Sequence, residues 1–313
     1  MQVVIQRSAP VLLYELVAMF NSHAAGRYRR RSGQHTREHL NWRAVLDRWM
    51  KYAGERSSPA AINRHQVRAW LDQLAAEGLT RGYVNQCLAR LRRFVRWAAD
   101  LDYIPITIDG ELRLVRPLVA LRSSARESAP RVPPALDEIA KLLPYLPVMA
   151  RRVLQLSKLT GARPGELLEI TNAEIHIDAM GSRLTPLQHK SAHHGRSRVI
   201  PLNRAAAQLV ESLWRPLCPA DFLFSGTSKT GHYTIEAYRQ SIARACKRAG
   251  VAHCTPYDVR RAVARAVRSV SGLDATQSLM GHADASTTEI YAPIDASETA
   301  AFRLAQRATE VLS

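Results

Sequence analysis

Five residues in four separate segments have side chains that can bind a phosphate and move a proton. The segments lie at residues 160–167, 188–202, 255–261 and 279–291, and the residues are Arg163, Lys190, Arg260, His282 and Tyr291. An arginine presents two parallel N–H donors to phosphate oxygens. A tyrosine hydroxyl becomes a good nucleophile only where its surroundings favour the phenolate. Each segment alone is a weak signal, and their order and separation give the pattern its weight.

The charge of the chain points to a polyanionic partner. Its 313 residues include 44 Lys and Arg against 27 Asp and Glu, which gives a formal net charge of +17. Nucleic acid is the default partner of so basic a chain. Two alternatives stay open at this point: a basic protein without such a partner, and an anionic membrane surface, although the sequence shows no amphipathic anchor.

Composition argues against several classes of protein. Hydrophobic residues make up 46% of the chain and charged residues 23%, as in a globular protein. No apolar run approaches the roughly eighteen residues of a membrane span, and residues 1–10 lack the pattern of a secretory signal. Without a membrane span or an amphipathic anchor, we expect no membrane partner. The cysteines are not spaced for a disulfide scaffold, so we expect reduced thiols and a cytoplasmic location. They are Cys87, Cys218, Cys246 and Cys254.

The elements that must position these residues fall into two groups, and the first group is helical. Apolar residues recur at helical spacing in three successive segments. These residues are Trp42, Val45, Leu46 and Trp49, then Val67, Trp70, Leu71 and Leu74, then Val84, Leu88, Leu91 and Val95. The second segment ends at Glu77 and Gly78, where the glycine is placed to cap a helix.

The third helical segment also carries arginines away from its apolar stripe. They are Arg90, Arg92, Arg93 and Arg96. We expect this face to lie against the phosphate backbone of DNA. An ordinary solvated face is the alternative.

The second group mixes helices and strands. Helical patterns cover residues 135–146, 148–160, 204–215 and 234–249, and Pro164 can begin a further helix because its missing N–H costs nothing there. Residues 174–177 and 197–202 are predicted strands with a turn at 193–195, and several short helices are expected after residue 249. The predicted fold class is mostly α with a small antiparallel β-sheet. Residues 1–115 form a helical domain, 116–134 a basic linker, and 135–313 a second domain with a helical C-terminal tail.

At the four segments the sequence resembles the tyrosine recombinase (phage integrase) family. Residues 78–98 resemble that family's N-terminal core-binding domain, and residues from about 135 onward resemble its catalytic domain, so the resemblance covers most of the chain. It implies the two-domain tyrosine recombinase architecture. It also implies a site-specific recombinase that cleaves and rejoins DNA.

The resemblance implies a role for each site residue. Tyr291 matches the nucleophile, which would form a 3′-phosphotyrosine and release a 5′-hydroxyl without ATP, cofactor or metal. Arg163 and Arg260 match an arginine pair that stabilises charge on the phosphate oxygens in the transition state. Lys190 matches the general acid, and His282 matches a histidine that hydrogen-bonds the phosphate. Glu166 matches an acidic position that would orient Arg163.

One position departs from the family pattern. The family usually has histidine three residues before its second arginine, and this chain has Tyr257 there. A neutral phenol can donate a hydrogen bond to phosphate, but it is a poor proton acceptor near neutral pH. We therefore expect Tyr257 to keep the hydrogen bond, with the base role weakened or taken by water.

The resemblance also implies partners. They are double-stranded DNA at specific recombination sites and three further copies of the chain, in a tetramer that exchanges strands through a Holliday junction. An accessory DNA-binding protein is a further candidate partner, and the C-terminal segment around Phe302 packs either on a neighbouring protomer or on its own core. We favour a mobile-element role, as in transposition, through integration, excision or cointegrate resolution.

Three other interpretations compete. The fold can serve DNA architecture with weak catalysis because of Tyr257, or the chain can be a type IB topoisomerase with the same chemistry. The helical N-terminal domain argues against the topoisomerase. A metal site at His189, His193 and His194 is disfavoured because no acidic or cysteine partner stands at matching spacing.

Overall fold

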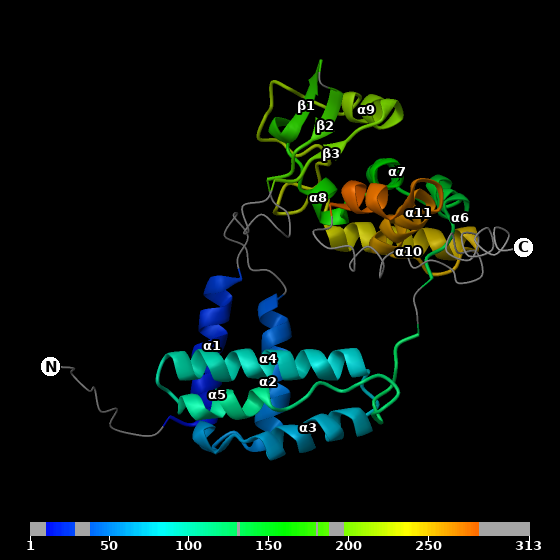
Figure 1. Cartoon of the computed structure of the whole chain (residues 1–313). Helices are drawn as coiled ribbons and strands as arrows, with labels where there is room; N and C mark the ends of the chain where they lie inside the picture. The colour runs from blue at the N-terminus through cyan, green and yellow to red at the C-terminus, as the bar shows by residue number, and fades with distance from the viewer. Residues whose placement is uncertain (1–10, 29–37, 130–131, 180, 188–196, 282–313) are drawn as a thin grey trace, which may run out of the picture. The chain divides into compact units, whose positions relative to one another are not determined.

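The protein divides into two compact units, Met1–Pro130 and Arg131–Ser313, which we call the N-terminal and C-terminal units (Figure 1). The computed structural model describes residues 11–28, 38–129, 132–179, 181–187 and 197–281. Among these residues, no helix has both the length and the apolar character needed to cross a membrane.

The N-terminal unit is helical throughout its described elements. They are α1 (Leu13–Arg27), α2 (Glu38–Ala53), the 3₁₀-helix η1 (Pro59–Ala61), α3 (Arg64–Ala76), α4 (Arg81–Asp100) and α5 (Ile106–Arg113). Helices α1 and α2 lie side by side, and α4 runs across them with α5 along it (Figure 1). The three helical segments predicted from periodicity are therefore confirmed as α2, α3 and α4.

Local chemistry explains where these helices begin and what they bury. The Asn63 side chain accepts from two backbone N–H groups at the start of α3, and the Thr80 hydroxyl accepts from Tyr83 N at the start of α4. Such caps satisfy N–H groups that have no partner inside the helix. The apolar stripe of α2 is buried, with Trp42 and Trp49 at most 1% exposed. Burial of such faces in one core holds the helices together.

The segment predicted as a basic linker, 116–134, packs on the N-terminal unit over most of its described length. Leu118 and Ala125 are buried in the core of that unit. Asn85 exchanges two hydrogen bonds with the backbone of Leu118, at 2.8 and 3.0 Å. Arg81 N donates to the carbonyl of Arg126 at 2.9 Å. These contacts fix the segment without regular secondary structure.

The C-terminal unit combines helices with one small sheet. Its helices are α6 (Leu136–Ala140), η2 (Leu143–Tyr145), α7 (Val148–Thr160), α8 (Pro164–Leu168), η3 (Asn172–Glu174), α9 (Arg204–Glu211), α10 (Ile235–Ala249) and α11 (Pro256–Met280), and its strands are β1 (Ile175–Asp178), β2 (Gly181–Leu184) and β3 (Ile200–Pro201). Figure 1 shows the sheet and α9 at one end of the unit, α10 and α11 at the other, and α7 between them. The predicted fold class is confirmed.

The sheet is antiparallel in the order β1-β2-β3. Ile175 pairs with Leu184, and Leu184 pairs with Ile200. All three side chains are buried, so one row across the sheet faces the core. The register therefore fixes the start of β3 at Ile200, two residues after Arg198.

Three elements differ from the sequence-based expectations. The helical pattern at 135–146 breaks into α6 and η2 because Pro144 has no N–H to continue the helix. Strand β2 has only four residues and was not expected. Where short helices were expected after residue 249, α11 spans Pro256–Met280 as two helical segments that join at Gly272, where φ is +79°, and residues from 282 onward lie outside the described residues. Glycine adopts that conformation without the steric cost that other residues pay.

Candidate active site

Four of the predicted site residues belong to the described part of the C-terminal unit: Arg163, Glu166, Tyr257 and Arg260. Lys190, His282 and Tyr291 lie outside the described residues, as do His189, the predicted turn at 193–195 and Phe302. The described residues therefore include the arginine-bearing part of the site.

Arg163 is held by Glu166 at the start of α8. Arg163 is the residue before the helix, and Pro164 is its first residue, as predicted. Oε1 of Glu166 accepts from Nη1 of Arg163 at 2.6 Å, and Oε2 accepts from the backbone N of Arg163 at 3.0 Å. The carboxylate is 3% exposed and the arginine side chain 17%. One buried acid thus fixes both the backbone and the guanidinium of this arginine.

Gly161 ends α7 and turns the chain toward Arg163. Its φ of +61° is left-handed. A Cβ placed there would lie 2.5 Å from Cε of Met280 and 3.0 Å from Cγ1 of Val263. The left-handed conformation favours glycine here, and a larger residue would also have to displace the Met280 and Val263 side chains.

Arg260 is buried in the first half of α11 and joins two distant backbone segments. It is 1% exposed. Its Nη1 donates to the carbonyl of Gly161 at 2.6 Å, and its Nη2 donates to the carbonyl of Met280 at 2.7 Å. Because Gly161 lies two residues before Arg163, the Arg260 guanidinium and the Arg163 segment share one anchoring point.

Tyr257 lies one helical turn before Arg260, at the exposed start of α11. Its exposed fraction is 44%. The turn is fixed by Asp258, which is 1% exposed and accepts from the backbone N of Thr255 at 2.8 Å, from the Thr255 hydroxyl at 2.7 Å and from Arg261 at 3.0 Å. Residues three apart share a helix face, so Tyr257 and Arg260 lie on the same side of α11.

Arg198 is a residue of this region that sequence reasoning did not single out. It lies just before β3 and is 7% exposed. Its Nη2 donates to the carbonyl of Leu279 at 2.9 Å, and its Nε lies 3.7 Å from Oε2 of Glu166. Burial lowers the pKa of the Arg198 guanidinium from its ordinary value, and the Glu166 carboxylate opposes that shift. The sequence showed Arg198 only as part of a strand-like stretch.

The four arginines predicted to contact DNA lie on α4 in the N-terminal unit, and they differ in their surroundings. Arg90 pairs with Glu38 at 3.0 Å, and its Cζ lies 5.9 Å from the centre of the Trp42 ring. Arg92 donates to carbonyls that include those of Leu112 and Val115.

The other two of these four arginines are more open. Arg96 pairs with the buried Asp109 at 3.0 Å and keeps 49% of its side chain exposed. Arg93 is exposed. Among these four arginines, Arg93 and Arg96 therefore present the most accessible charge.

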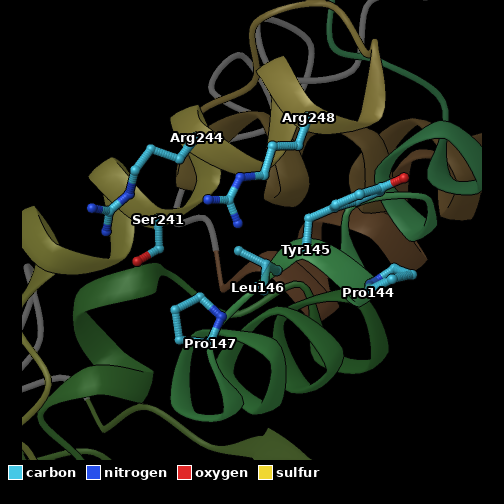
Figure 2. A pocket seen from close by; sticks show the side chains of 7 residues that line it. All are labelled: Pro144, Tyr145, Leu146, Pro147, Ser241, Arg244 and Arg248. Atoms are coloured by element: carbon cyan, nitrogen blue, oxygen red, sulfur yellow. The ribbon is translucent and has the colours of Figure 1, made fainter.

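The C-terminal unit also has a hollow away from these residues, with a volume of 510 Å³. Arg244 and Arg248 reach it from α10, and Pro144, Leu146 and Pro147 line it from the segment between α6 and α7 (Figure 2). None of the predicted site residues contributes to it. Within the described ranges, no group of His, Cys, Asp or Glu side chains has the arrangement of a metal site.

Comparisons with known proteins agree with the residue pattern. The model of the phage integrase family matches residues 134–298, and the model of its N-terminal SAM-like domain matches residues 28–100. The tyrosine recombinase XerC of Rhizobium meliloti (strain 1021) is 27% identical over 248 residues, which cover 76% of this chain and 75% of that protein.

Solved structures share the fold. A lambda integrase tetramer bound to a Holliday junction is similar with a TM-score of 0.67 and 17% identity, over 93% of this chain and 81% of that chain. The integrase of transposon Tn1549 in complex with transposon right end DNA has a TM-score of 0.67 and 16% identity, over 95% of this chain and all (100%) of that chain. The chain belongs to the phage integrase family of tyrosine recombinases.

Proposed function

We propose that this chain is a site-specific DNA recombinase that cleaves and rejoins double-stranded DNA through a 3′-phosphotyrosine at Tyr291. The observation that carries the proposal is that Arg163 and Arg260 are both held near the turn at Gly161. Arg163 directly precedes α8 and Arg260 belongs to α11, and both are fixed by contacts of 2.6 to 3.0 Å. Fixed guanidinium groups stabilise the charge that develops on phosphate oxygens without reorganising during the reaction.

The remaining steps of the proposed mechanism belong to residues of the same sequence pattern. The Tyr291 hydroxyl loses its proton to water and its oxygen attacks the scissile phosphorus. The phosphodiester bond to the 5′ oxygen breaks, and Lys190 gives that leaving oxygen a proton. His282 and Tyr257 donate hydrogen bonds to the phosphate. The bond energy stays in the phosphotyrosine link, so a 5′-hydroxyl can attack it and restore the DNA.

The proposed partners are a specific recombination site on double-stranded DNA and other copies of this chain. The net charge of +17 supports a DNA partner. Similarity in fold to a lambda integrase tetramer on a Holliday junction supports assembly as a tetramer. Similarity in fold to the Tn1549 transposon integrase supports a role in a mobile element. An accessory DNA-binding protein is a further proposed partner.

The proposal is tested with DNA from the genetic neighbourhood of the gene, carrying a nick that traps the cleaved strand. We expect a covalent protein–DNA complex on a denaturing gel. Tyr291→Phe is the matched control, because it removes the attacking oxygen and keeps the ring. A complex that persists in Tyr291→Phe would refute the assigned nucleophile, and absence of any complex despite DNA binding would refute the enzymatic function.

A second function, DNA architecture with weak catalysis, is favoured by one observation. Tyr257 occupies a position at the start of α11 where the family usually has histidine, and a phenol is a poor base near neutral pH. Under this alternative the wild type binds DNA without forming the covalent complex, and Tyr257→His restores cleavage. Under the recombinase proposal the wild type cleaves, and Tyr257→Phe is slower because it loses a hydrogen bond to phosphate.

A further inference from the structure

Arg198 is a buried charge that the proposed mechanism does not use. An arginine is seldom as little exposed as 7% unless anionic or polar partners hold it. The Nε of Arg198 makes no hydrogen bond within the described residues. It lies 3.7 Å from the Glu166 carboxylate, which is an ion-pair distance rather than a hydrogen bond.

Arg198 contacts two other elements, and its Nη1 also donates to the carbonyl of Val199 at 3.3 Å. Glu166 belongs to α8 and already holds Arg163. Leu279, whose carbonyl accepts from Nη2 of Arg198, belongs to the last turn of α11. The next carbonyl along, that of Met280, accepts from Arg260. Arg198 thus contacts Glu166, which holds Arg163, and it contacts Leu279, the residue before Met280. The Met280 carbonyl in turn accepts from Arg260.

Together with the backbone between them, these contacts form a closed ring of interactions. Arg260 connects Gly161 to Met280, and Arg198 connects Leu279 to Glu166. Glu166 holds Arg163, which returns to Gly161 through two peptide units. Arg198 completes this ring of contacts by linking α8 to the end of α11.

The chain also approaches Arg198 closely at the residue before His282. A Cβ on Gly281 would lie 2.5 Å from Nη1 of Arg198, and φ at Gly281 is +60°. The backbone at the end of α11 therefore packs directly on the guanidinium. A shorter or uncharged side chain at position 198 would leave both this backbone and Glu166 with more freedom.

We propose that Arg198 is a positioning residue for DNA cleavage: it fixes Glu166, and through it Arg163, relative to the end of α11. The inference rests on the proposed function. Arg198 acts through neighbouring groups, because its Nη2 donates to the Leu279 carbonyl and its Nε lies 3.7 Å from Oε2 of Glu166. Residues that orient reacting groups in this way commonly change activity by roughly 10- to 100-fold when replaced.

The test uses Arg198→Met in the full-length chain, with Arg183→Met as the matched control. Arg183 is on β2 of the same sheet and pairs with Asp178 at 2.9 Å, with 27% of its side chain exposed. We measure the rate of covalent complex formation at saturating protein, the DNA dissociation constant and the melting temperature. We expect Arg198→Met to slow cleavage roughly 10- to 100-fold, with an unchanged dissociation constant, and we expect Arg183→Met to match the wild type.

Arg198→Lys and a double mutant separate positioning from a merely structural role. Lysine keeps the charge and one contact but cannot reach both sides as a fork, so it should recover only part of the rate at an unchanged melting temperature. If Arg198 acts through Glu166, Arg198→Met adds no further loss of rate in a Glu166→Gln background. Should Arg198→Met fail to fold, Arg198→Lys and its cycle with Glu166→Gln carry the test.

Three outcomes would overturn the proposal. Arg198→Lys or Arg198→Met could cleave at the wild-type rate, their loss could lie wholly in DNA affinity, or it could add fully to that of Glu166→Gln. Each of these leaves the proposed function standing, because the wild type still forms the Tyr291-dependent complex. A wild type that forms no such complex overturns both proposals together.

Discussion

The arginines of α4 and those of the C-terminal unit represent two uses of the same side chain. Along α4, the four arginines predicted to contact DNA follow one another within three turns of one helix, and they contact residues of α2 and α5 or face outward. In the C-terminal unit, Arg163, Arg198 and Arg260 come from distant parts of the sequence and meet through one buried carboxylate and three backbone carbonyls.

This difference in exposure and contacts indicates what each group of arginines can contribute to a reaction on DNA. Exposed arginines attract the phosphate backbone, and each one contributes little because water and salt screen it. Buried arginines with short contacts hold their place, so under the proposed function Arg163 and Arg260 can stabilise a phosphate without rearrangement. Substitutions in α4 should therefore change affinity or stability, whereas substitutions in the C-terminal group should change the rate of cleavage.

The largest expected effect is that of Arg260→Lys. Lysine keeps the charge but cannot bridge the carbonyls of Gly161 and Met280 as a fork. We expect cleavage to fall roughly 100- to 1000-fold, as when one fixed donor to a transition state is lost, with DNA affinity nearly unchanged. Single-turnover cleavage at saturating protein, with a filter-binding titration beside it, measures both. Wild-type cleavage by Arg260→Lys would remove the distinction between the two groups of arginines.

A smaller effect is expected from Gly161→Ala, which tests how firmly the backbone held by Arg260 is seated. Alanine in a left-handed conformation costs about 1–2 kcal/mol, and contact with Met280 adds about 1–3 kcal/mol of overpacking. Gly250→Ala is the control, because Gly250 also caps a helix at positive φ but has open space around it. Urea unfolding should show Gly161→Ala to be the less stable variant, and equal stability would mean that the Met280 contact relaxes freely.

A third prediction concerns Arg90, which we expect to serve stability as well as charge. Its side chain is 15% exposed, pairs with Glu38 and lies over Trp42. Arg90→Ala should lower the stability of the protein by about 1 kcal/mol through loss of the ion pair and the cation–π contact. The melting temperature checks this, and Arg93→Ala on the same helix is the control that should melt like the wild type.

The smallest effect is expected from Arg93→Ala, which should change only DNA affinity. The loss of one phosphate contact should reduce the slope of log affinity against log salt concentration by about 0.9. Titrations at several salt concentrations measure the slope, and the cleavage rate of the bound protein should stay unchanged. An unaltered slope would indicate that this face of α4 does not lie on DNA.

Patterns in the sequence predicted those features of the structure that depend on residues close together along the chain. Helical spacing identified α2, α3 and α4 because each apolar stripe repeats within a few residues. Short motifs pointed to Arg163 and Arg260 in the same way. Arg198 was missed because its carbonyl partner lies 81 residues further along the chain, and no local pattern reports such a contact. The folding of residues 116–129 onto the N-terminal unit was missed for the same reason.

The break at Gly272 has a consequence for the lengths of chain that this fold tolerates. In a straight helix, Arg260 and Met280 would stand about 30 Å apart, yet Nη2 of Arg260 reaches the Met280 carbonyl at 2.7 Å. The second half of α11 must therefore double back at Gly272. One inserted residue on either side would turn the following chain by about 100° and carry the Met280 carbonyl away from Arg260. Natural relatives should accordingly vary in length around the 95% exposed Leu217, and keep a constant count from Arg260 to Met280.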